Sequence, residues 1–91
     1  MFFLVHMIVN IPADIPEDEA NRIKLLEKQY SQDLQRQGKW PHIWRVVGEY
    51  ANYSIFDAES NDELHTLLSR LPLFPYMQIK VTPLAKHPSA I

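Results

Sequence analysis

Glu27 is the residue whose position in the sequence best suits acid–base chemistry. Apolar side chains recur around it at helical spacing: Ala20, Ile23, Leu26, Tyr30 and Leu34. On a helical wheel of about 100° per residue, Glu27 falls roughly 40° from Ile23, within this apolar stripe. Burial there raises the pKa of a carboxylate, as a general base requires. The alternative is a structural carboxylate that reaches solvent from the border of the stripe or pairs with a buried cation.

Arg45 is the candidate for binding a negatively charged ligand, because its planar guanidinium pairs with both oxygens of a carboxylate. The alternative is a surface ion pair at the edge of a sheet. Lys28 follows Glu27 but points about 100° away around the helix, so solvation is the simpler interpretation. Three polar side chains alternate along one predicted strand: Tyr50, Asn52 and Ser54. We expect them either to bind a polar substrate or only to contact neighbouring strands.

Several kinds of chemistry are excluded by composition. The chain has no cysteine and only two glycines, which excludes thiol catalysis, disulfides and a glycine-rich phosphate loop. None of the four histidines has the spacing of metal ligands, so we expect no metal site and no cofactor. The histidines are His6, His42, His65 and His87. A net charge of −2 gives no indication of a nucleic-acid or membrane surface.

The 91 residues are predicted to form one domain, 1–91. The apolar start from Met1 to Val9 has no preceding Lys or Arg and no cleavage site, so an export signal is not expected. We therefore expect a cytoplasmic protein.

The elements that must position these residues follow the order strand, helix, strand, strand, helix, strand. The predicted strands are 2–11, 39–47, 49–57 and 76–81. Asp14 and Glu17 resemble a capping pair for the first helix, and Gly38 suits a left-handed stop. Ser60 and Glu63 have capping-box spacing, and four leucines follow at helical intervals: Leu64, Leu67, Leu68 and Leu71.

This βαββαβ order predicts an α+β, ferredoxin-like fold, a four-stranded antiparallel sheet with two helices on one face. The other face has no cover from its own chain. If that face is apolar, a second subunit must cover it.

The hairpin between the middle strands predicts which residues share a face. Gly48 and Glu49 suit a two-residue type II′ turn, which fixes the register. One face then carries Trp44, Tyr53, Val46 and Ala51, and the other carries Arg45, Asn52, Ile43, Ser54, Val47 and Tyr50. The first set is the more apolar, so we expect it to lie under the helices. Arg45 would then share a pocket with Glu27 only through a slipped register, a tilted helix or a neighbouring subunit.

Motifs along the whole chain resemble the muconolactone delta-isomerase family. They are Glu27-Lys28, Gly38-Lys39-Trp40, Trp44-Arg45, Tyr50-Ala51-Asn52-Tyr53-Ser54-Ile55-Phe56-Asp57, Leu71-Pro72-Leu73-Phe74-Pro75-Tyr76-Met77 and His87-Pro88. Family members can carry histidine before Tyr50, where this chain has Glu49. The resemblance implies a homodecamer that converts muconolactone to 3-oxoadipate enol-lactone without a cofactor. The reaction belongs to the catechol branch of the β-ketoadipate pathway in aromatic degradation, and it transposes a C=C bond.

The residue chemistry agrees with this implied 1,3-proton shift. Glu27 would be the base and proton carrier, and Arg45, with Lys28, would bind the substrate carboxylate. Hydrogen-bond donors would come from Tyr50, Asn52 and Ser54, and pocket walls from Trp40, Trp44, Phe74 and Tyr76. The alternatives are a chloromuconolactone dehalogenase on the same scaffold, a non-catalytic small-molecule-binding module and, as a weaker case, a cofactor-free monooxygenase.

Overall fold

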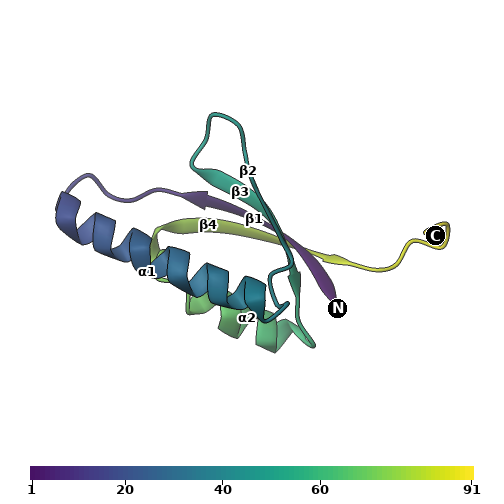
Figure 1. Ribbon diagram of the computed structural model, residues 1–91. Coiled ribbons are helices and arrows are strands. Elements are labelled where there is room, and N and C mark those ends of the chain that lie inside the picture. The colour runs from purple at the N-terminus through teal and green to yellow at the C-terminus, as the bar shows by residue number, and fades with distance from the viewer.

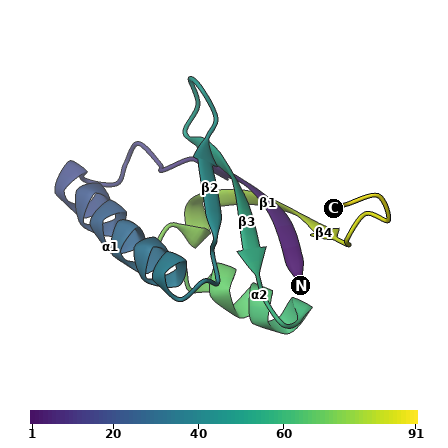
Figure 2. The ribbon, with the colours of Figure 1, turned by 45° about the vertical axis from the view of Figure 1, so that its right-hand side comes forward.

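The chain forms a four-stranded sheet with two helices against one face. The computed structural model describes residues 1–91. Its elements are β1 (Phe2–Val9), α1 (Glu17–Arg36), β2 (His42–Arg45), β3 (Ala51–Asp57), α2 (Asn61–Ser69), the 3-10 turn η1 (Phe74–Tyr76) and β4 (Met77–Leu84). The sheet order is β2-β3-β1-β4 with every neighbouring pair antiparallel. Figures 1 and 2 show α1 and α2 on the same side of the sheet, which confirms the ferredoxin-like prediction.

The observed strands differ in length from the predicted ones. β2 covers only four residues, because the segment from Lys39 to Pro41 makes the turn out of α1. β4 extends to Leu84, beyond the expected end at Val81. It contains Pro83, which an edge strand tolerates because proline lacks only the donor that would otherwise face solvent. Neither helix combines the length and apolar character needed to cross a bilayer.

The core is built on β1, the strand between β3 and β4. Phe3, Val5 and Met7 are fully buried, whereas the residues between them are only partly so. The leucines that α2 contributes lie in the same cluster, as its helical spacing predicts. From α1 only Leu34 belongs to it as a buried residue.

The predicted register of the β2–β3 hairpin is confirmed, but the predicted face is wrong. Arg45 pairs with Asn52 as expected. Asn52 in turn pairs with Met7 of β1, and directly opposed residues point to the same face of a sheet. Met7 is buried beneath the helices, so Arg45 and Asn52 lie on the helix side. Trp44 and its partner Tyr53 lie on the open face instead.

The turn of this hairpin also differs from the prediction. The N–H of Glu49 donates to the carbonyl of Val46 over 3.2 Å, so the turn spans residues 46–49. Gly48 is its third residue, with a φ of 80°, and Val47 before it has a negative φ. This is the pattern of a type II turn rather than type II′. The N–H of Val46 donates to the carbonyl of Ala51, which preserves the register.

The end of α1 follows its sequence signal, whereas its beginning does not. The N–H of Gly38 donates to the carbonyl of Gln35, and that of Lys39 to the carbonyl of Leu34, which is a Schellman motif. Gly38 has the φ of 75° that the motif needs. The predicted capping pair of Asp14 and Glu17 is wrong. The helix begins after Pro16, whose fixed φ suits that position, without a side-chain cap.

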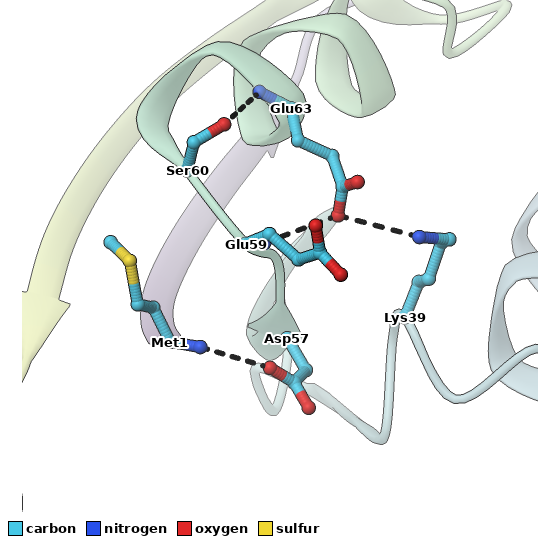
Figure 3. A network of polar contacts seen from close by, with 6 residues as sticks. All are labelled: Met1, Lys39, Asp57, Glu59, Ser60 and Glu63. Atoms are coloured by element: carbon cyan, nitrogen blue, oxygen red, sulfur yellow. Dashed lines mark hydrogen bonds and ion pairs between the residues drawn. The ribbon is translucent and has the colours of Figure 1, made fainter.

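A polar network fastens the end of the sheet where the chain begins (Figure 3). The terminal ammonium of Met1 lies 3.2 Å from Asp57 Oδ1. The N–H of Glu63 donates to Ser60 Oγ over 3.0 Å, which confirms Ser60 as the predicted cap of α2. The Glu63 carboxylate accepts from the N–H of Glu59 and not from that of Ser60, so the reciprocal half of a capping box is not formed. Lys39 Nζ lies 3.3 Å from Glu63 Oε1. The network therefore joins the turn after α1 to the start of α2.

Two apolar surfaces are left without cover. The open face of the sheet carries Trp44 and Tyr53, which are 56% and 44% exposed. On α1, Leu25 and Leu26 are 56% and 42% exposed. Leu26 belongs to the predicted apolar stripe but is exposed, because α1 packs against the core nearer its C-terminal end, through Tyr30 and Leu34.

We predict that Gly38→Ala destabilises the chain by about 1 kcal/mol, the approximate cost of a Cβ in the left-handed region. A Cβ at this position meets no atom within 4 Å, so the cost lies in the backbone alone. Urea denaturation measures the change. Gly38→Asn should lose less, and Gln37→Ala, where φ is helical, should change little. Unchanged stability in Gly38→Ala would contradict this explanation.

Candidate active site

The carboxylate of Glu27 is half-buried between α1 and the segment that precedes η1. Glu27 Oε1 accepts a hydrogen bond of 2.8 Å from the backbone N–H of Leu73. Burial raises the pKa of Glu27, and the hydrogen bond from Leu73 lowers it by less. The prediction of a desolvated carboxylate in the helix stripe is thus confirmed. With one donor on one oxygen, the other oxygen is free to exchange a proton with a bound molecule.

Glu27 opens into a pocket of about 220 Å³ between α1 and the helix side of the sheet. Its lining consists of Val9, Lys24, Glu27, Lys28, Ser31, Trp40, Ile43, Arg45, Tyr50, Asn52, Leu73 and Met77. A second hollow of about 280 Å³ shares Val9, Ile43, Arg45, Tyr50 and Asn52 with it, so the two are parts of one depression. Half of the twelve lining residues are apolar, and the other half are polar or charged.

Glu27 and Arg45 line the same pocket within a single chain. The face correction explains this, because the side of β2 that carries Arg45 is the side beneath α1. No slipped register and no neighbouring subunit is required. A carboxylate with a raised pKa and a guanidinium are therefore brought together by the fold of one chain.

The side chain of Asn52 is oriented by a hydrogen bond from Ser54. The hydroxyl of Ser54 donates to Asn52 Oδ1 over 2.7 Å. Ser54 is fully buried and does not line the pocket. Because the amide oxygen of Asn52 is occupied, its NH₂ group is left to donate to a ligand. Ser54, predicted to contact a substrate, is placed to orient Asn52 instead.

Tyr50 lies between the cationic and the acidic parts of the pocket. The guanidinium carbon of Arg45 is 5.3 Å from the centre of its ring, and Lys24 Nζ is 5.9 Å from it. Burial raises the pKa of Tyr50, the charge of Arg45 lowers it, and that of Glu27 raises it. The phenol therefore stays protonated near neutral pH and can donate a hydrogen bond.

Trp40 forms the inner wall of the pocket. Its side chain is 1% exposed, and its ring stacks on Phe56 with centroids 4.5 Å apart. The indole Nε1–H is buried and has no hydrogen-bond partner in the chain. A buried donor without a partner is costly to the stability of the chain.

Three of the predicted wall residues lie elsewhere. Trp44 is on the open face, where its ring lies 5.3 Å from that of His42. Phe74 packs against the hydrophobic core from η1, and Tyr76 ends that turn. None of these side chains lines the pocket of its own chain.

Three polar groups of the pocket were missed by the sequence analysis. Lys24 lies three residues before Glu27, and Ser31 lies four residues after it. On a helix, this spacing places both beside Glu27. Their helical spacing was therefore a usable signal. The N–H of Leu73 was not predictable from residue type, because the group belongs to the backbone and its direction depends on the turn at η1.

The arrangement suits proton transfer on a small anion. It combines a carboxylate with a raised pKa, donors on Asn52 and Tyr50, and a guanidinium for a negative group.

Comparisons with known proteins identify the chain's relatives. The family described as Muconolactone delta-isomerase matches residues 1–90. Muconolactone Delta-isomerase 1 of Acinetobacter lwoffii is 67% identical over 91 residues, covering 100% of this chain and 95% of the relative. The muconolactone Delta-isomerase of Cupriavidus pinatubonensis is 67% identical, covering 100% and 99%. A crystal structure of muconolactone isomerase matches with a TM-score of 0.94 and 50% identity, covering 100% of this chain and 95% of that one.

We predict that Glu27→Gln unfolds at a higher urea concentration than the natural chain at pH 7.5. A raised pKa means that the folded chain holds the Glu27 proton more tightly, so this stabilisation is complete below the unfolded pKa and disappears as pH rises through the folded one. Glutamine stays neutral and still accepts from Leu73. The gain should shrink at pH 4, and the exposed Glu17→Gln should show none. A lower midpoint for Glu27→Gln at pH 7.5 would refute the prediction.

Proposed function

The chain belongs to the muconolactone delta-isomerase family and is an isomerase of muconolactone, and we propose that Glu27 carries the proton that the reaction moves. The observation that carries this proposal is the half-buried Glu27 carboxylate, which has one backbone donor and shares a pocket with Arg45.

The reaction proceeds through a dienolate. Glu27 removes the proton from C4 of the lactone ring, and the electron pair of that C–H bond forms a C3=C4 double bond. The former C2=C3 pair moves toward the carbonyl, whose oxygen takes up negative charge. The protonated Glu27 then returns the proton to C2, which gives 3-oxoadipate enol-lactone. The base is regenerated, so no atom is gained or lost.

The donors of the pocket stabilise the developing negative charge. The NH₂ group of Asn52, oriented by Ser54, is suited to the lactone carbonyl oxygen. Arg45, with Lys28, binds the substrate's side-chain carboxylate. The raised pKa of Glu27 suits both halves of the reaction, because one group must take the proton and give it back.

The proposed function includes a metabolic pathway and a cellular compartment. The substrate places the enzyme in the catechol branch of the β-ketoadipate pathway of aromatic degradation. We propose that it acts in the cytoplasm. The reaction as written uses only side chains and backbone groups of the chain.

We predict that Glu27→Gln lowers kcat by roughly three orders of magnitude, because the amide cannot accept the C4 proton. Muconolactone turnover followed by absorbance, together with deuterium incorporation at C2 in D₂O, measures this. Glu17→Gln makes the same chemical change in the exposed first turn of α1 and should keep full activity.

Two outcomes would exclude parts of the proposal. Near-normal turnover in Glu27→Gln would remove Glu27 as the proton carrier. Chloride release from a chlorinated muconolactone that outpaces isomerisation of muconolactone would identify a dehalogenase on this scaffold.

We also propose that the chain works as a homo-oligomer, a decamer as the family resemblance implies. The open face of the sheet supports this, since it carries Phe2, Trp44, Tyr53 and Leu84 in exposed positions. Large apolar surfaces of this kind usually mark an interaction site. A second copy of the chain is the occupant proposed.

We predict that Trp44→Glu, which places a charge on the open face, shifts the protein to smaller species in sedimentation velocity. Val47→Glu makes a comparable change at the tip of the hairpin, where the side chain is 95% exposed, and should leave the assembly intact. An unchanged sedimentation coefficient for Trp44→Glu would exclude the open face as the interface.

A further inference from the structure

The basic side chains of α1 fall into two groups. Arg22 pairs with Glu19 at 2.7 Å, and Arg36 pairs with Asp33 at 2.9 Å. Lys24 and Lys28 have no carboxylate within ion-pair distance. The helix therefore neutralises the cations that lie away from the pocket and leaves the two beside it unpaired.

These unpaired cations give the pocket a charge opposite to that of the chain. Lys24, Lys28 and Arg45 line it, and Glu27 is its only carboxylate. The chain as a whole carries a net charge of −2. A concave site lined by one sign of charge attracts ligands of the other sign and speeds their encounter.

The ring of Tyr50 brings two of these cations together. Lys24 Nζ from α1 lies 5.9 Å from the ring centre, and the Arg45 guanidinium from β2 lies 5.3 Å from it. Cations are attracted to aromatic faces within about 6 Å. The consecutive elements α1 and β2 thus direct their charges to one part of the pocket.

We propose that Lys24 and Arg45, gathered by the ring of Tyr50, form a two-cation subsite for the substrate carboxylate, in which Lys24 selects the charged lactone. The inference rests on the proposed function and adds a residue and a specificity to it. It also gives Tyr50 a second role, since its ring, and not only its hydroxyl, positions the subsite. Lys28, which the proposed function places beside Arg45, is then a third cation of the pocket, and it does not contact this ring.

The test compares Lys24→Gln with Arg22→Gln, which removes the same charge from the same helix but from a paired residue outside the pocket. We expect Lys24→Gln to raise KM for muconolactone by roughly tenfold, with kcat little changed, as for loss of a charged hydrogen-bond partner. Arg22→Gln should change neither constant. The increase should diminish at high ionic strength.

The methyl ester of muconolactone isolates the carboxylate. Because the ester is neutral, Lys24→Gln should leave its KM unchanged, and the preference of the enzyme for acid over ester should fall with the same substitution. An equal effect on acid and ester, or an equal effect of Lys24→Gln and Arg22→Gln, would overturn the proposed subsite.

Binding to the catalytically impaired background separates this inference from the proposed reaction. Calorimetric titration of muconolactone into Glu27→Gln, with and without Lys24→Gln, should show binding weakened by roughly tenfold. This result would support the subsite even if turnover were absent, whereas unchanged binding would overturn it even in an active enzyme. Tyr50→Phe should preserve the Lys24 effect, and Tyr50→Leu should abolish it.

Discussion

The site depends on one hydrogen bond between two distant segments, from the Leu73 N–H to the Glu27 carboxylate. It crosses from the middle of α1 to the turn before β4. A carboxylate with several backbone donors would have a lowered pKa and be a poor base. With a single donor, burial outweighs the hydrogen bond and the pKa of Glu27 rises. The bond thus fixes the position of the Glu27 carboxylate while the pKa of this group stays raised.

Features set by local sequence were predictable. Gly38 ends α1, Ser60 caps α2, and the β2–β3 register follows from the hairpin, because each depends on a few neighbouring residues. The face of the hairpin was not predictable from its own composition. Both faces carry large apolar side chains, and the choice depends on pairing with β1, whose buried side is marked by Met7.

The same distinction holds for the site. Glu27 was predictable because a carboxylate within an apolar stripe conflicts with helix amphipathicity. Arg45 and Asn52 were predictable by type, but their common pocket with Glu27 followed only from the sheet. Ser54 acts through its hydrogen bond to Asn52, and this contact could not be predicted from the residue types alone.

The alternation of β3 links chemistry to assembly. Asn52 faces the pocket, whereas its neighbour Tyr53 faces the open side that we propose to be covered by another copy. Because side chains alternate, a slip of one residue in the pairing of β3 would exchange these faces. It would remove Asn52 from Glu27 and place Tyr53 beneath the helices. The polar network at the other end of the sheet, from Met1 to Asp57, helps to hold the ends of β1 and β3 in register. In so short a chain, one strand register therefore maintains both the pocket and the surface that we propose for a second copy.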